Sequence, residues 1–317
     1  MRLLFSCDAH GSELVWKKFL KLGLRQKADV LFMAGDLTGK TIVPIVKREK
    51  DEWYCSWKHA QNTILRSQHE VDKAMDSMRQ RGFYPLLTTP GEVESLKKES
   101  QKLEEIFVSV MKEGIRRWLT EIIGEVRIPK HVKIFVSPGN DDYWEIDDII
   151  NANSRVTNPL GKVVEIGSYK IISCAYVNTT PWATPRECSD DVLEHKLEDL
   201  FNEVKGCKNV ICNFHAPPHG TNLDIAVKLD KDLKPVLSFG QPVFEHVGSR
   251  AVRESLEKHQ PTLALHGHIH ESYGFVYLGR TLCVNPGSEY EAGILRAYLI
   301  DLPEAPGEKP DLIRLEA

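Results

Sequence analysis

Five short apolar runs in this 317-residue sequence end in side chains that could hold metal ions. In chain order these side chains are Asp8 and His10, Asp36, Asn140 followed by Asp141, His215, and His268 with His270. Together they offer oxygen and nitrogen donors and no thiolate, which suits hard or borderline divalent ions such as Mn, Fe or Zn. A carboxylate shared by two such ions holds them about 3.5–4 Å apart, the spacing used for in-line attack at phosphorus. The set therefore predicts a pair of metal ions and cleavage of a phosphoester.

The runs before these residues are predicted to be buried strands, because they are short, apolar and bounded by turn residues. Ligands usually lie just beyond the carboxyl ends of strands in open α/β sheets. A single pair such as Asp8 and His10 would equally fit a surface turn with a capping aspartate. The recurrence of potential ligand residues after several apolar runs is what favours a metal site. The strands expected on this basis span residues 2–7, 28–33, 132–136, 162–166, 169–175, 209–214, 262–265 and 294–301, with helices at 12–24 and 190–204.

The segment after Asp36 admits a second interpretation. Gly39, Lys40 and Thr41, with Ala34 in place of the first glycine, nearly complete a phosphate-binding P-loop. That mechanism needs a helix directly after the lysine, so that backbone N–H groups point at phosphate. The β-branched run around Pro44 instead predicts a strand at the edge of a sheet. Lys40 then either meets a phosphate near the metals or extends into solvent.

Residues 41–129 differ in character from the rest and are expected to form an insertion within a single domain that spans residues 1–317. Apolar residues recur at helical spacing from Ile64 to Met78 and again from Leu96 to Val110. The proline-bounded segment from Pro85 to Gly91 lies between them and predicts a turn. The expectation is an antiparallel helical hairpin whose two helices pack on each other, or which caps the active site or forms a dimer surface.

Composition gives few hints about partners. A net charge of −4 and a pI near 6.3 imply no overall attraction to nucleic acid or anionic membranes, and no apolar run is long enough to cross a bilayer. The beginning of the sequence lacks the features of a signal peptide, and the seven cysteines include no C-x-x-C pair. We therefore expect a soluble, cytoplasmic protein with reduced thiols and a small phosphoester as substrate.

The ordered motifs resemble those of the calcineurin-like metallophosphoesterase superfamily. The matching blocks are Asp8-Ala9-His10, Gly35-Asp36, Gly139-Asn140-Asp141, His215 and Gly267-His268-Ile269-His270. The resemblance implies an α/β fold of four layers, a two-sheet β-sandwich flanked by helices, with residues 285–301 as its closing segment. It further implies that Asp36 bridges two ions and that a metal-bound hydroxide between them is the nucleophile. By this resemblance one ion is held by Asp8, His10 and His270, and the other by Asn140, His215 and His268.

The sequence departs from this family at Asp141, where many members have a histidine that protonates the leaving oxygen. A carboxyl group beside two cations should be ionised at neutral pH, since nearby positive charge lowers its pKa, and it would be a poor general acid. A negative charge there also disfavours a doubly charged monoester more than a singly charged diester. We therefore expect a phosphodiesterase. The alternative is that Asp141 points away and another group, such as His219, acts as the acid.

Other residues near these motifs carry weaker expectations. His266 lies within an apolar run and is expected to be a core histidine or a partner that orients a ligand. His219 either touches substrate or is merely exposed in its loop. Asp142 is expected to cap a helix over residues 144–150. The remaining histidines, His246 among them, are assigned no role.

The expected activity is hydrolysis by a binuclear metal centre, with Mn favoured over Fe or Zn. The same site could serve a phosphomonoesterase, and the same scaffold could be a non-catalytic metal-binding module, although such a module would typically have lost some ligands. A homodimer formed through the insertion is a further expectation. A nuclease gains no support from the acidic balance of the sequence or from any aromatic-basic repeat.

Overall fold

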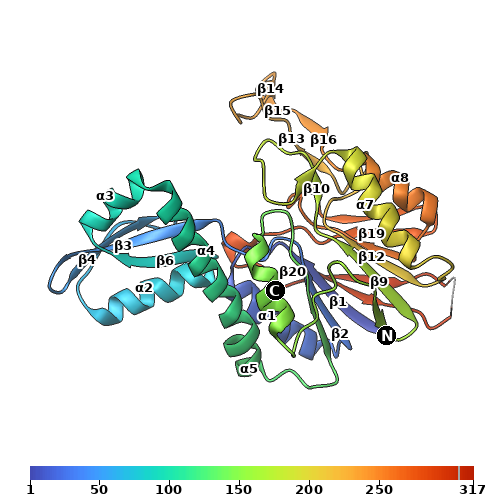
Figure 1. The fold of residues 1–317 in the computed structure, drawn as a ribbon, viewed down its shortest axis with the longest axis horizontal. Helices are drawn as coiled ribbons and strands as arrows, with labels where there is room; N and C mark the ends of the chain where they lie inside the picture. Colours follow the sequence, from blue (N-terminus) through green and yellow to red (C-terminus); the bar gives the residue numbers. More distant parts are fainter. Residues whose placement is uncertain (306–307) are drawn as a thin grey trace.

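The computed structural model describes residues 1–305 and 308–317 and contains two facing sheets, which lie in the right half of Figure 1. The first sheet has the strand order β21-β20-β1-β2-β7, and the second has the order β18-β19-β17-β12-β9-β8. The first comprises β1 (Arg2–Cys7), β2 (Val30–Ala34), β7 (Lys133–Val136), β20 (Arg296–Asp301) and β21 (Asp311–Glu316). The second comprises β8 (Val164–Ile166), β9 (Tyr169–Cys174), β12 (Val210–Phe214), β17 (Leu263–Leu265), β18 (Gly274–Leu278) and β19 (Thr281–Asn285).

The inner strands of these sheets, such as β1, β2, β12 and β17, are buried on both faces, which is why they are continuous apolar runs rather than alternating ones. In β1, Leu3 and Phe5 point into the space between the sheets, whereas Leu4 points outward to a layer of helices. The second sheet repeats this arrangement, with Ile211 facing inward and Cys212 facing helices on the other side. The predicted strands at the motif-bearing positions are therefore present, and the four-layer α/β sandwich is confirmed.

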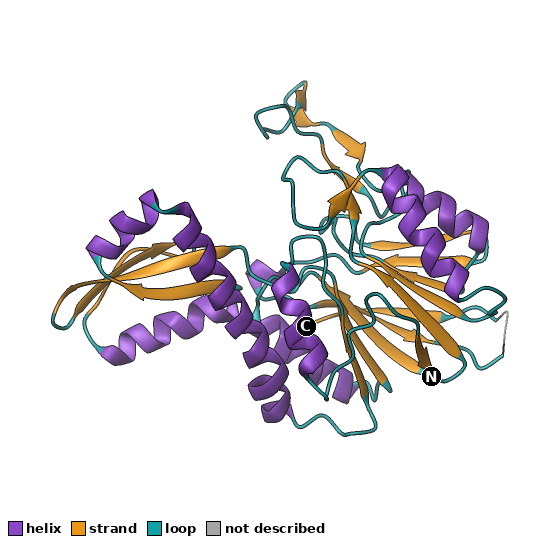
Figure 2. Ribbon diagram, viewed as in Figure 1, coloured by secondary structure: helices purple, strands orange, loops and turns teal. Residues whose placement is uncertain are grey.

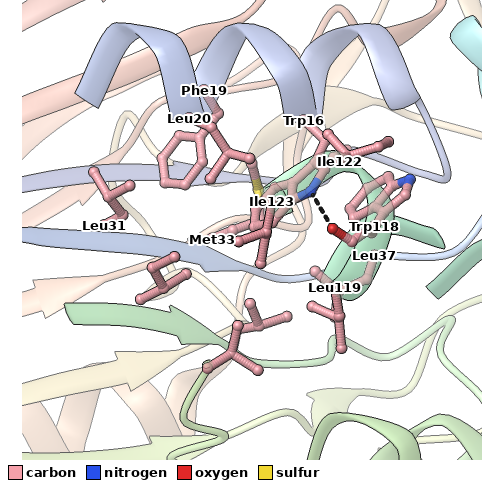
Figure 3. Close-up of a cluster of buried hydrophobic side chains, with 14 of the residues drawn as sticks. Trp16, Phe19, Leu20, Leu31, Met33, Leu37, Trp118, Leu119, Ile122 and Ile123 are labelled. Carbon is pink, nitrogen blue, oxygen red and sulfur yellow. Dashed lines mark hydrogen bonds between the residues drawn. The ribbon is translucent and has the colours of Figure 1, made fainter. Parts of the chain in front are cut away.

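Helices cover the outer face of each sheet, as Figure 2 shows. The second sheet is covered by α7 (Asp190–Glu203) and α8 (Arg250–His259). The first is covered by α1 (Glu13–Arg25), α4 (Ser100–Arg117), the π-helical turn η1 (Trp118–Ile122), α5 (Ile123–Val126), the 3-10 turn η2 (Trp144–Ile146) and α6 (Asp147–Ala152). Trp16 and Trp118 stack at 5.2 Å between ring centroids, and the Trp16 indole N–H donates to the Trp118 carbonyl (Figure 3).

The insertion is not the predicted helical hairpin. It contains a sheet of order β5-β4-β3-β6 that packs on α2, with further helix in α3. Its elements are β3 (Thr41–Glu49), β4 (Glu52–Trp57), β5 (Ala60–Leu65), α2 (Gln68–Gln80), β6 (Phe83–Thr88) and α3 (Pro90–Lys98). The apolar spacing coincides with α2 and α4 in part, because Ile64, where the first span was expected to begin, lies in β5, and Leu96, where the second was expected to begin, lies in α3. The segment expected as a turn, Pro85 to Gly91, instead contains the end of β6 and the start of α3. The strand β6 pairs in parallel with β3, a partner distant in sequence that no local pattern reveals.

Thr41 begins strand β3, and the described residues Thr41–Glu49 form no helix after Lys40. The P-loop interpretation is therefore wrong. The strand lies inside its sheet rather than at the edge. Pro44 is tolerated there because the pairing with β4 begins only at Ile45, so the missing N–H of Pro44 interrupts no bond on that side.

Hydrogen bonds between side chains and backbone tie the insertion to the loops that follow β1 and β2. The Gly39 N–H donates to the Tyr84 hydroxyl at 2.9 Å, and the Ser12 hydroxyl donates to the Gln80 carbonyl at 2.6 Å. Gly82 has a φ of +84°, and a Cβ there would collide with the carbonyl oxygen of His10. The insertion is therefore joined closely to the segments that carry His10 and Lys40, and the far end of α4 continues into the main core.

Smaller elements surround the carboxyl ends of the central strands. They are β10 (Val177–Asn178), β11 (Glu187–Cys188), β13 (Ile225–Val227), β14 (Leu237–Ser238), β15 (Gln241–Pro242), β16 (Phe244–His246) and the 3-10 turn η3 (Tyr290–Ala292). The ribbons β13–β16 and β14–β15 form an arm that projects from the body at the top of Figure 1. Within residues 1–305 and 308–317, no helix has both the length and the apolar character needed to span a bilayer.

Candidate metal centre

The carboxyl ends of strands from both sheets converge on one cluster of polar side chains. Asp8 follows β1, Asp36 follows β2 and Asn140 follows β7, whereas His215 follows β12 and His268 follows β17. The connecting loops hold one another through backbone bonds, such as Asp8 N–H to the Ala34 carbonyl at 3.1 Å. The topology of the sandwich therefore brings together residues that are far apart in the sequence.

Asp8, His10 and His270 form one group whose donor atoms could share an ion. The Nε2 atoms of His10 and His270 face each other at 3.0 Å. Asp8 and His10 are completely buried, which excludes the surface-turn interpretation of this pair. Both adopt positive φ, +55° for Asp8 and +40° for His10, a strained backbone that concentrates at functional sites.

Asp36, His215 and His268 form a second group. Asn140 belongs beside it, because its Oδ1 lies 3.0 Å from His215 Nε2 while its Nδ2 donates to the Thr184 hydroxyl at 2.8 Å. The bond to Thr184 leaves the amide oxygen of Asn140 turned toward the cluster. All seven residues expected as metal ligands are thus brought together.

Asp36 lies between the two groups. One carboxylate oxygen, Oδ2, is 3.8 Å from His10 Nε2, and the other, Oδ1, is 3.4 Å from His215 Nε2. The Asp141 backbone N–H also donates to Oδ1 at 2.9 Å. This carboxylate therefore has one oxygen directed to each side of the cluster.

Glycines that precede the ligands make room for the carboxylates. A Cβ at Gly139 would lie 2.5 Å from the Asp36 backbone nitrogen and nearer still to Asp36 Oδ1. A Cβ at Gly267 would lie 2.5 Å from Asp8 Oδ2, the oxygen that accepts the His268 N–H at 3.0 Å. No other residue fits at these positions without displacing a carboxylate.

The protonation of the cluster follows from burial and charge. Burial holds the pKa of His10 well below its usual range and lowers the pKa of His268 to about 3, so both imidazoles are neutral. Burial also acts to lower the pKa of His215, but the charges of Asp36 and Asp8 outweigh it and raise that pKa to about 9. Burial acts to raise the pKa of Asp36, yet His215 and His10 keep it well below normal.

The Asp141 carboxylate faces Lys40, with which it forms an ion pair at the mouth of the cluster. Burial and the charge of Asp36 raise the pKa of Asp141 to about 7, whereas Lys40 acts in the opposite direction. Asp141 Oδ2 does not point away from the site, because Asp141 and Lys40 line the same cleft as Asp36.

Asp142 is not the predicted helix cap. Its carboxylate accepts from the backbone N–H groups of Leu37, Thr38 and Gly139 at 2.8–3.2 Å and from the Thr38 hydroxyl at 2.6 Å. The η2 turn that follows has no side-chain cap. Asp142 instead binds the Asp36 loop to the Asn140 loop, a long-range role that its sequence neighbours do not reveal.

Histidines outside the two groups have distinct environments. His266 is buried, and its Nδ1 lies 2.8 Å from the Phe214 carbonyl and 2.9 Å from that of Ala216, so it braces the strand ends beside His215. His219 lies on the wall of the cleft, with Nδ1 3.6 Å from the buried carboxylate of Asp224. No motif in the sequence pointed to His246, whose Nδ1 hydrogen-bonds to the same carboxylate at 2.8 Å.

A cleft of about 700 Å³ opens on the cluster. Its walls include Lys40, Asp141, His219, His246 and the loop between β10 and β11. Among the described residues that line it, none belongs to the 41–129 insertion. The volume is of the size that accommodates a small organic ligand.

The cluster fits a pair of divalent cations. Buried carboxylates require compensating charge, and Asp8 and Asp36 are no more than 2% exposed. His10 and His268 are neutral imidazoles, the form that binds metal, and facing nitrogens such as those of His10 and His270 are typical of donors that share an ion. Oxygen and nitrogen donors without sulfur match hard or borderline ions.

The fold and the cluster define a four-layer α/β sandwich with a group of potential metal ligands at the carboxyl ends of its strands. The chain belongs to the calcineurin-like phosphoesterase family, whose sequence model matches residues 1–272. The resemblance seen in the motifs is thereby confirmed.

Individual relatives agree with this placement. Uncharacterized protein MJ1162 of Methanocaldococcus jannaschii is 34% identical over 158 residues, a match that covers 49% of this chain and 64% of that protein. One crystal structure superposes with a TM-score of 0.59 at 18% identity and covers 99% of this chain and 98% of its own. The crystal structure of TT1561 of Thermus thermophilus gives a TM-score of 0.51 at 14% identity, with coverage of 93% and 92%. At these identities the two structures share the fold.

Proposed function

We propose that this protein is a phosphodiesterase with a binuclear metal centre, for which Mn is the favoured ion. The observation that supports two ions is the position of Asp36, whose two oxygens approach His10 on one side and His215 on the other. Asp8, His10 and His270 would hold one ion, and Asn140, His215 and His268 the other. A carboxylate directed to both sets is the group that a pair of ions would share.

The ions would supply Lewis acidity and would lower the pKa of a shared water, so that a bridging hydroxide is available as the nucleophile near neutral pH. The protein's own part is to fix the ligands before substrate arrives. Asp8 accepts from the Asp36 and His268 backbones, and Asn140 is oriented by Thr184. Such fixed ligands need no rearrangement during the reaction.

The preference for a diester follows from the charges around position 141. Lys40 pairs with Asp141, so the pair contributes no net positive charge at the mouth of the cluster. An imidazole at this position would supply a donor and, when protonated, a positive charge, both of which favour the second negative charge of a monoester. The cluster is therefore better matched to the single charge of a diester.

Protonation of the leaving oxygen is assigned to His219, with Asp141 as the other candidate. His219 lies on the cleft wall and has the Asp224 carboxylate behind its ring. Asp141, beside two cations, would be ionised and unable to donate.

Hydrolysis of ethyl 4-nitrophenyl phosphate and of 4-nitrophenyl phosphate, measured with added Mn, tests this function. The two esters release the same leaving group, so their ratio of kcat/KM reports the charge of the substrate. We expect the diester to be preferred and Asp36→Asn to lower its hydrolysis at least about 100-fold, since the ions contribute several kcal/mol of charge stabilisation. Asp76→Asn changes an exposed carboxylate in α2 and serves as the control.

Each other outcome bears on a specific part of the proposal. Preference for the monoester would overturn the argument from Asp141 and Lys40. Equal activity of Asp36→Asn and the wild-type protein would overturn the proposal that two ions share the Asp36 carboxylate. Binding of two ions without turnover of either ester would favour a non-catalytic metal-binding module.

The remaining expectations stay proposals with their own tests. A cytoplasmic location agrees with the seven cysteines, all of which are free thiols. The substrate is proposed to be a small phosphoester because the cleft holds about 700 Å³. Sedimentation of the purified chain would test a homodimer, and hydrogen exchange with and without phosphate would test whether the insertion acts as a cap.

A further inference from the structure

The loop between β10 and β11 carries a solvent-exposed aromatic side chain at the cleft. Trp182 is 59% exposed and lines the same cleft as Asp36, Asn140 and His268. We propose that Trp182 is a stacking platform for a planar group of the substrate, and that the substrate is a small phosphodiester that bears a nucleobase. This inference rests on the proposed phosphodiesterase function and adds its substrate class.

The tip of the loop is held in one conformation by a single carboxylate. Glu187 accepts hydrogen bonds from the backbone N–H and hydroxyl groups of both Thr180 and Thr184, at 2.6–2.9 Å. The Trp182 N–H donates to the Thr180 hydroxyl oxygen at 3.1 Å, and Ala183 adopts a φ of +50°. Because the residues on both sides of Trp182 are fixed, the ring is presented at the cleft before any ligand binds, which reduces the entropic cost of stacking.

The base of the loop is attached to the metal centre. The Thr184 hydroxyl accepts from Asn140 Nδ2 at 2.8 Å. Arg186 is completely buried, donates from Nε to the Asp142 carbonyl at 2.9 Å, and forms an ion pair with Asp147 at 2.8 Å. Trp182 is thus held at a set position relative to the phosphate-binding end of the cleft.

The chemistry of the cleft around Trp182 favours a base over a plain apolar group. Thr179, Thr180 and Asn178 line the same cleft. The Asn178 amide nitrogen donates to the Val247 carbonyl at 3.0 Å, and its Oδ1 has no donor within residues 1–305 and 308–317. A nucleobase offers both a π face for the indole and N–H donors for such an acceptor. The cleft, at about 700 Å³, has room for a nucleoside beside the phosphorus.

Two diesters with one leaving group test this inference. We compare ethyl 4-nitrophenyl phosphate with thymidine 5′-(4-nitrophenyl phosphate) in the presence of Mn, for the wild-type protein and for Trp182→Ala. The thymidine ester should have a KM about tenfold lower than the ethyl ester in the wild type, and Trp182→Ala should remove that advantage while leaving the ethyl ester unchanged. Trp182→Phe keeps a stacking face and should retain most of the advantage.

Equilibrium binding supplies a readout that does not depend on turnover. Calorimetry should show that Trp182→Ala weakens binding of thymidine 5′-monophosphate about tenfold and leaves binding of inorganic phosphate unaltered. Phe239→Ala is the matched control, since Phe239 is an exposed aromatic residue that is not among the residues lining the cleft.

The results separate this inference from the function on which it rests. If neither diester is hydrolysed, the phosphodiesterase function fails. If both are hydrolysed but the wild type does not distinguish them, or Trp182→Ala affects both equally, the nucleobase platform is refuted and the phosphodiesterase stands.

Discussion

Replacing Gly139 with alanine tests whether the glycines set the position of the shared carboxylate. A Cβ at residue 139 would lie 2.5 Å from the Asp36 backbone nitrogen and 2.7 Å from the Gly35 carbonyl carbon, and closer still to Asp36 Oδ1. Ordinary van der Waals contact begins near 3.4 Å, so the methyl group must displace these two backbone atoms by about 0.7–0.9 Å. The atoms it meets are backbone or a buried carboxylate, which cannot turn aside as the end of a flexible side chain could.

A displacement of this size should disable the site without unfolding the protein. A misplacement of about 1 Å in a catalytic constellation costs on the order of 100-fold in rate. We therefore expect Gly139→Ala to lower kcat/KM for ethyl 4-nitrophenyl phosphate about 100-fold at saturating Mn and to weaken Mn binding in calorimetry. Far-ultraviolet circular dichroism should match that of the wild type.

Gly91→Ala is the matched control for this substitution. Gly91 lies in α3, and a Cβ there meets no atom within 4 Å. Its activity and Mn affinity should equal those of the wild type. Wild-type activity and Mn affinity in Gly139→Ala would refute the idea that the close approach of residue 139 positions Asp36.

Three further predictions concern charge, protons and packing. Asp141→His should raise the monoester-to-diester ratio of kcat/KM about tenfold, because it removes a negative charge and frees Lys40, and an unchanged ratio would contradict the argument from position 141. Mn affinity should rise by up to about tenfold per pH unit from pH 7 to about 9. Burial acts to lower the pKa of His215, but the charges of Asp36 and Asp8 outweigh burial and raise that pKa to about 9. Below that pH, ion binding must therefore displace the proton of His215. Calorimetry in buffers of different ionisation enthalpy measures the released proton, and a flat pH profile would oppose the assignment of His215 as a ligand. Trp118→Ala should reduce the free energy of unfolding by about 3–5 kcal/mol in urea, since Trp118 is buried and stacked on Trp16, whereas Trp182→Ala at an exposed site should change it by less than about 0.5 kcal/mol.

The strands that carry the motifs could be predicted because they are buried on both faces, whereas the four-layer arrangement itself was inferred from the family resemblance. Leu3, Leu4 and Phe5 are all apolar, since alternate side chains enter the inter-sheet core and the helix layer. Each such run ends at the point where the chain turns over the sheet, so the polar residue that follows is placed at the same edge as its counterparts. For this reason the candidate metal ligands could be predicted from the sequence without knowledge of the strand order.

The insertion could not be predicted in the same way. Val71 and Met78 face the sheet at helical spacing, and α2 is where they indicated it. The strand β6 contains Pro85 and apolar residues that are half buried, and its partner β3 is distant in the sequence. A half-buried strand that contains one proline and is closely followed by another resembles a turn until its partner is known, because its stabilisation comes from that pairing.

The roles of the residues that support the site could also not be predicted from the sequence. Asp142 accepts backbone N–H groups from the loop after β2, and Asp224 hydrogen-bonds to His246, which lies 22 residues later. Lys40 pairs with Asp141 across the site. None of these contacts is set by local spacing. They depend on how loops from different strands approach one another in three dimensions.

Anomalous diffraction from a crystal soaked in Mn tests the binuclear centre most directly. We expect two anomalous peaks, one beside Asp8, His10 and His270 and the other beside Asn140, His215 and His268, with the Asp36 carboxylate between them. A single peak, or peaks away from these side chains, would contradict a binuclear centre at the ends of the strands.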